Sequence, residues 1–228
     1  MTNETSTQTD TAAIAAACRL TKLDTLGGKT SATRGAVDEC DILPFCPGLA
    51  RGNPVWKVYF DGGSLVLKSG MPGYQDRYRD QRKFIVLLDE SMSKVLSIRS
   101  EFKGATGDMR PEPCIALPEN GESYTGPPDV EPKLTFIDAV DAVLSKGIGS
   151  PYLAKEIYGS YVMYSKPGSD ARPVWVITLR GLPPIPSYGR PPGAPEPPAW
   201  MRNRRRNVVD AMTGEVLFAT NTPLPDDG

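Results

Sequence analysis

The sequence predicts an α+β fold with two small tandem domains, each packing one helix on an antiparallel sheet. A stretch that begins Pro-Val-Trp occurs twice, at residues 54–62 and 173–181. An apolar run that ends in Asp follows each copy, at residues 87–89 and 208–210. The tryptophans lie 119 positions apart (56 to 175) and the aspartates 121 (89 to 210). Two matches at nearly one offset indicate a duplicated unit, and a helical pattern precedes each pair.

The first domain is expected over residues 10–102, after a polar and flexible tail at residues 1–9. Its helix is predicted over residues 12–20, which are rich in Ala and are followed by two glycines that end the helix. Residues 29–53 predict no clear element. Apolar runs between turn residues predict the strands of an antiparallel meander at residues 55–60, 64–68, 84–88 and 94–99.

A Pro- and Gly-rich linker is expected over residues 103–132, followed by a second domain over residues 133–220. Thr135 and Asp138 have the Thr-x-x-acid spacing of a helix start, and the helix is expected to end at Lys146. Strands at residues 156–164 and 174–179 and a hairpin at 208–217 complete this domain. A Pro-rich insertion at 183–207 interrupts it, and a polar tail at 221–228 follows it.

The charge balance and the absence of histidine exclude several function classes. The chain carries 26 basic and 27 acidic residues, a net charge of −1, so no overall field favours a nucleic-acid partner. No histidine occurs, which removes Ser-His-Asp and Cys-His catalysis and histidine-ligated zinc. No apolar run has the length of a transmembrane helix. We therefore expect no catalytic, cofactor-binding or metal-binding residues.

The four cysteines leave two alternatives open. Cys40 and Cys46 are spaced to close a small disulfide loop, if the compartment is oxidising. Otherwise all four, with Cys18 and Cys114, are buried thiols. The first ten residues lack the basic start of an export signal. The chain is therefore expected either to be cytoplasmic or to be numbered after removal of such a signal.

The second half combines a helix at 135–146, a strand that contains Trp175, and Val208-Val209-Asp210 followed by Thr213-Gly214-Glu215-Val216-Leu217. In these features it resembles the PepSY domain. The first half is less similar, because Ser93 stands where that family has a turn glycine. The resemblance implies small helix-on-sheet domains, a binding role that includes peptidase inhibition, and a periplasmic, cell-surface or secreted bacterial location. It implies no catalytic residues.

Four repeated residues are predicted to serve the fold. Trp56 and Trp175 alternate with apolar residues on one strand face, which favours core positions over exposed stacking platforms. Asp89 and Asp210 occupy equivalent turns, where a carboxylate accepts backbone N–H bonds; metal binding or acid–base chemistry is the alternative. An enzymatic interpretation would need a carboxylate pair such as Asp138 and Asp141, which the pattern places on an exposed helix face.

The insertion at 183–207 is the predicted contact surface for a partner. Its proline residues favour extended chain that loses little entropy on docking. It ends in a dense basic cluster that would bind phosphate or an acidic surface; the alternative is a solvated loop that protects an edge strand. The predicted partner-binding residues are Tyr188, Trp200, Arg202, Arg204, Arg205 and Arg206.

These observations predict a non-enzymatic binding module for a protein or peptide partner, in the manner of an exported peptidase-regulatory or envelope protein. The alternative is a structural subunit of a larger assembly, held through the Pro-rich insertion and the two tails. The sequence names neither the partner nor the oligomeric state.

Overall fold

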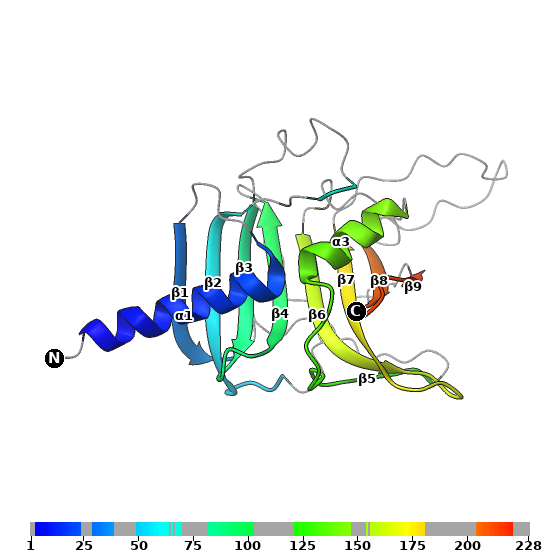
Figure 1. Ribbon diagram of the computed structural model, residues 1–228, viewed down its shortest axis with the longest axis horizontal. Helices are drawn as coiled ribbons and strands as arrows, with labels where there is room; N and C mark the ends of the chain where they lie inside the picture. The colour runs from blue at the N-terminus through cyan, green and yellow to red at the C-terminus, as the bar shows by residue number, and fades with distance from the viewer. Residues whose placement is uncertain are drawn as a thin grey trace, which may run out of the picture.

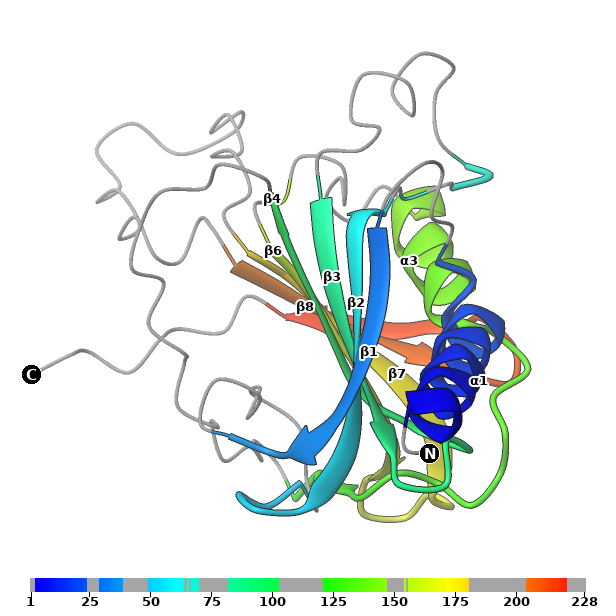
Figure 2. The same ribbon diagram turned by 90° about the vertical axis from the view of Figure 1, so that its left-hand side faces the viewer.

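The computed structural model of this protein describes residues 3–23, 29–38, 49–63, 65, 67–69, 82–102, 121–146, 154, 156–180 and 204–220. These residues form one nine-stranded antiparallel sheet (Figure 1). The two helices among them lie on the same face of that sheet, as the edge-on view from the β1 side shows (Figure 2).

Among the described residues, the first half contributes one helix and four strands, and the second half contributes one helix and five strands. The first half forms α1 (Asn3–Thr21), β1 (Lys29–Ala36), β2 (Pro54–Gly63), β3 (Arg82–Asp89) and β4 (Val95–Phe102). The second half forms β5 (Ser123–Thr125), α3 (Phe136–Ser145), β6 (Glu156–Ser165), β7 (Arg172–Arg180), β8 (Arg204–Asp210) and β9 (Val216–Thr220). The strand order is β1-β2-β3-β4-β6-β7-β8-β9, and β5 pairs with β6 outside this path.

The prediction of an α+β fold with two helix-on-sheet domains is wrong, because the fold is mainly β and both halves share one sheet. The halves join where β4 pairs with β6, from Ile98 opposite Gly159 to Glu101 opposite Glu156. Each half alone would leave an unpaired strand edge at this point. Pairing the two edges satisfies their backbone N–H and C=O groups, which is why one sheet forms instead of two.

The main core lies between the sheet and the two helices. Along β2, Trp56, Val58 and Phe60 are buried on the helix side, and the intervening Lys57 and Tyr59 belong to the other side. This alternation is the two-residue period of a strand with one face on a core. Buried residues of β3, β4, β6 and β7 continue the same core across both halves.

Helix α1 covers the first half of the sheet with small side chains. Ala13, Ala17 and Leu20 are buried at the four- and three-residue spacing of one helix face. The helix begins at Asn3, whereas the sequence predicted its start at residue 12. Among the described residues, no helix has both the length and the apolar character needed to cross a membrane.

Helix α3 covers the second half, close to its predicted bounds. Thr135 accepts a bond from the N–H of Asp138, and the Asp138 carboxylate accepts one from the N–H of Thr135, which confirms the predicted capping box. Phe136, Val140 and Val143 are fully buried against the sheet. Trp175 donates its indole N–H to the Leu134 carbonyl at 2.8 Å, which fixes the approach to the helix.

The observed strands differ from the predicted ones in three places. β1 was not predicted, because it is an edge strand on which Ala32 is the buried residue, so its sequence lacks alternation. β2 continues to Gly63 with a register shift beside it, and the described residues 65 and 67–69 form no strand. The expected linker at 103–132 is described from residue 121, where it contains β5.

Candidate functional site

The aspartates at 89 and 210 are bound within their own turns. The Asp89 carboxylate accepts the Lys94 N–H at 2.6 Å and the hydroxyls of Ser91 and Ser93. The Asp210 carboxylate accepts the N–H groups of Met212 at 2.9 Å and Thr213 at 3.0 Å. Both carboxylates therefore hold a strand-to-strand turn, and the second oxygen of Asp210 lies 3.7 Å from the Arg172 guanidinium.

Two opposing effects set the pKa of Asp89. Partial burial acts to raise it, but the hydrogen bonds from Ser91, the Lys94 N–H and Ser93 outweigh burial and hold the pKa below its ordinary value of 3.8. The charged carboxylate is therefore more stable in the folded chain than in the unfolded one. The stabilisation is fully present above pH 3.8 and is lost as the pH falls below it through the folded-state pKa.

We expect Asp89→Asn to weaken the acid sensitivity of the fold. The amide keeps the shape of the carboxylate but cannot gain a proton, so the free energy of unfolding should fall less between pH 5 and pH 3. Urea unfolding at several pH values in this window measures the effect. Asp170→Asn, in an exposed turn, is the control and should keep the wild-type slope. An Asp89→Asn slope equal to the control's would contradict the assignment.

Trp56 and Trp175 belong to the core. Trp175 is fully buried between Phe136 and Tyr161, with ring centroids 6.0 and 5.2 Å away. Trp56 is buried on the helix side of β2.

Asp138 and Asp141, the carboxylate pair that an enzymatic interpretation would need, are each bound by another part of the chain. Asp138 pairs with Lys22 at 2.8 Å, and Asp141 accepts the Ser69 N–H at 2.7 Å.

The basic cluster of the predicted contact surface lies in a strand where the structure describes it. Arg204, Arg205 and Arg206 open β8, and Arg206 is buried while Arg205 is half-buried. The position of Arg206 therefore does not match a solvated loop. Three other predicted contact residues and two predicted disulfide partners lie outside the described residues: Tyr188, Trp200, Arg202, Cys40 and Cys46. Cys18 packs half-buried against the core.

Sequence reasoning missed the sheet face opposite the helices, which we call the open face. Cross-strand pairing aligns one row of its residues across eight strands. That row is Ser31, Tyr59, Ile85, Arg99, Tyr158, Thr178, Arg206 and Thr220. The row is exposed at β2, where Tyr59 is 37% exposed, and buried at β7, where Thr178 is 2% exposed. The open face is therefore accessible around Tyr59, whereas Val55, Leu87 and Ser97 on the same face are buried.

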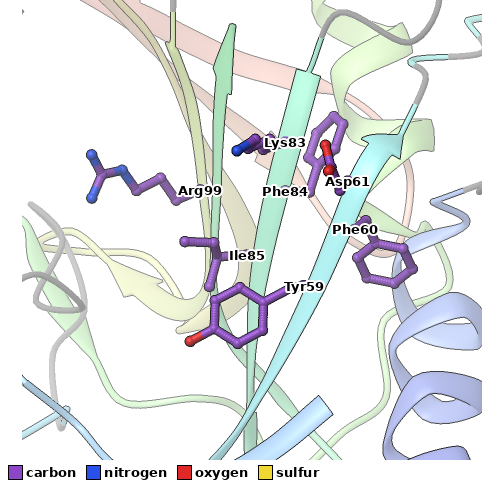
Figure 3. Close-up of a pocket in the computed structure, with 7 residues that line it drawn as sticks. All are labelled: Tyr59, Phe60, Asp61, Lys83, Phe84, Ile85 and Arg99. Atoms are coloured by element: carbon purple, nitrogen blue, oxygen red, sulfur yellow. The ribbon is translucent and has the colours of Figure 1, made fainter. Parts of the chain in front are cut away.

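A depression of about 190 Å³ lies on the accessible part of the open face. Tyr59, Ile85 and Arg99 come from β2, β3 and β4 and project from the same side of the sheet, whereas Phe60 projects towards α1 (Figure 3). Lys83 and Asp61 lie two residues along their strands from Ile85 and Tyr59, and they are opposite each other in the register of β2 and β3. The depression thus has an apolar floor of Tyr59 and Ile85 and charged groups at its rim.

A buried carboxylate anchors the inner edge of this region. Glu156 is 1% exposed and accepts the Tyr158 hydroxyl at 2.7 Å. Arg180 donates to the same carboxylate at 3.1 Å, and Arg99 approaches it at 3.8 Å. Burial, followed by the Glu156 charge, raises the pKa of the Tyr158 phenol well above its ordinary value, so Tyr158 remains a donor. One carboxylate therefore lies between two guanidinium groups and holds Arg99 at the rim.

Among the side chains that the structure describes, no group of three His, Cys, Asp or Glu residues is placed to hold a metal ion. The signal that the sequence did contain is the alternation in β2, where Lys57, Tyr59 and Asp61 share the face opposite Trp56. The same alternation that predicts a core position for Trp56 places Tyr59 on the opposite face.

Comparisons with protein-family models, with curated proteins and with solved structures found no match for this chain.

Proposed function

We propose that this chain is a non-enzymatic binding module that holds a protein or peptide partner on the open face over β1–β4. The observation that carries the proposal is the exposure of Tyr59 in the middle of this face. An antiparallel sheet can leave one face to solvent, but such a face is normally polar. A tyrosine beside the half-buried Ile85, within a depression, is instead typical of an interface anchor.

Two further features favour binding over catalysis. The chain contains no histidine, which is the most frequent general base. The carboxylates of Asp89, Asp210 and Glu156 are already held by turns or by arginine. The resemblance of the second half to the PepSY domain also implies a binding role, and we retain that role as a proposal.

A photoreactive phenylalanine derivative at position 59 tests the proposed face. The full chain, expressed in the cells that make it, should crosslink to a partner from position 59. The same derivative at Lys146, which is exposed just after α3 on the helix side, is the matched control and should give little product. The crosslinked partner should also bind the purified chain, and Tyr59→Ala should weaken this binding roughly tenfold or more, as for an interface anchor.

Crosslinks from position 146 but not from position 59 would overturn the proposal. Crosslinks from position 59 to second copies of the chain would instead favour the alternative of an assembly subunit.

A further inference from the structure

We propose that the partner adds an extended strand to the sheet: its backbone pairs with the outer edge of β1, and one large apolar side chain of that strand lies on Tyr59. This inference rests on the proposed function, because it names the form of the segment that the open face binds. It follows from the open edge of β1, the short side chains between that edge and Tyr59, and the projection of α1 beyond the sheet (Figure 1).

The outer edge of β1 has backbone groups available for pairing. β1 is the first strand in the sheet order, and within the described part of the chain it pairs with β2 alone. In an antiparallel pair, alternate residues direct their N–H and C=O groups away from the neighbouring strand. Ala32 is buried, but most residues of β1 are exposed, so this edge is accessible.

β1 is neither short nor interrupted, unlike many protected edge strands. It has eight residues, contains no proline and keeps one register with β2 from Lys29 to Ala36. Its two charged residues have acidic neighbours, because Arg34 pairs with Glu90 and Lys29 lies opposite Asp61. The strand at the other end of the sheet, β9, has five residues and a register shift in its pairing with β8. Short or bulged edges hinder strand addition, so β1 is the edge suited to it.

The side chains of β1 allow an added strand to reach Tyr59. Ser31 lies directly opposite Tyr59, and Thr33 is the next residue on the same face. Both are exposed, and both are short. A residue of the added strand opposite Ser31 would be two strand spacings, about 10 Å, from the Tyr59 backbone. An aromatic or long aliphatic side chain can extend over Ser31 to the Tyr59 ring, so backbone pairing supplies affinity and this side chain supplies selectivity.

Helix α1 would cover the added strand on the opposite side. The helix crosses the strands and projects beyond β1 (Figure 1). On its sheet-facing side Ala13 is fully buried, whereas Asp10, one turn earlier, is only half-buried, which agrees with a sheet that ends beneath the helix. A second copy pairing edge to edge about a two-fold axis normal to the sheet would bring its own α1 to the same side. The projecting turns therefore favour a single peptide strand over a second copy.

A displayed library of random 12-residue peptides, selected on the full chain, tests the proposal. Binding of the best peptide, followed by fluorescence anisotropy, should weaken roughly tenfold in Tyr59→Ala and should be unchanged in Lys146→Ala, an exposed position on the helix side. Replacing each backbone N–H of the peptide in turn by N-methyl should weaken binding roughly tenfold at alternate positions and little between them, because alternate N–H groups would donate to β1.

Amide hydrogen exchange, followed by NMR with the peptide at saturation, tests where the strand is added. Exchange at alternate amides of β1, between Thr30 and Ala36, should slow roughly tenfold or more. The amides of β9, at the other edge of the sheet, are the internal control and should keep their rates.

The outcomes separate this inference from the proposed function. If Tyr59→Ala weakens binding but N-methylation shows no alternation and the β1 amides keep their rates, the face binds a partner in another way and only this inference is wrong. If Tyr59→Ala binds the peptide as the wild type does, or if selection yields no peptide, both proposals fail. A free chain that light scattering shows to be a dimer, with its β1 amides already protected, would overturn the inference in favour of self-assembly through this edge.

Discussion

Replacing Trp175 with alanine is expected to lower the free energy of unfolding by about 3–5 kcal/mol, the range for large aromatic residues truncated in a core. Trp175 is fully buried in the core, where its ring lies against Phe136 of α3 and Tyr161 of β6. Its removal leaves a cavity between the helix and the sheet. It also removes the donor to the Leu134 carbonyl, which holds the start of α3.

Chemical denaturation measures this loss, and two variants separate its causes. Trp175→Phe keeps most of the ring volume and loses the N–H, so it should lose about 1–2 kcal/mol, much less than alanine. Tyr59→Ala, on the equivalent central part of β2, should change the stability by less than about 0.5 kcal/mol, because this residue is partly exposed. A Trp175→Ala chain as stable as Tyr59→Ala would contradict the described core.

Replacing Gly159 with valine is expected to lower the free energy of unfolding by about 3 kcal/mol, the upper part of the range for overpacked cores. A Cβ atom at position 159 would lie 2.5 Å from Cε2 and 2.7 Å from Cδ2 of Phe136. Phe136 is fully buried, so its ring cannot move aside into solvent. The side chain would push α3 away from the sheet at the strand that joins the two halves.

Gly35→Val is the matched control for this substitution. Gly35 also lies in a strand, but its nearest atom to a new Cβ is the end of the Lys57 side chain at 3.9 Å. Valine is favoured in strands over glycine, so the control should be neutral or slightly stabilising. Thermal unfolding of both variants measures the difference, and equal melting temperatures would argue against close contact between Phe136 and β6.

Local features of the fold could be predicted from the sequence because they depend on neighbouring residues. The capping box of Thr135 and Asp138 is one example, since both partners lie within one helical turn. Gly214 is another: its φ of 80° matches the positive φ expected of the Thr-Gly turn. In both cases the residue type and the spacing specify the hydrogen bonds without reference to the rest of the chain.

The single sheet could not be predicted in the same way. Apolar runs locate the strands that contain Val86 and Val176, but every strand offers two edges with the same backbone groups. The pairing of Ser100 with Ile157 depends on which edges remain open once each half has formed. No residue spacing encodes this choice, so a likeness between two halves suggested two domains where there is one sheet.

The candidate site was missed for a related reason. Tyr59, Ile85 and Arg99 belong to three strands and meet only through cross-strand register. Each residue alone is an ordinary strand residue in the sequence. The sequence drew attention instead to the insertion at 183–207, most of which lies outside the described residues.

The pairing of β4 with β6 has a consequence for how the molecule forms and fails. Contacts across this boundary join residues far apart in the chain, so ordering them requires closure of a long loop and slows folding. Until that step is complete, each partly folded half presents a bare strand that another chain can capture. Fragments divided at this boundary would keep an unpaired strand edge and would remain prone to aggregation. In the intact chain, β4 and β6 cover each other's edge.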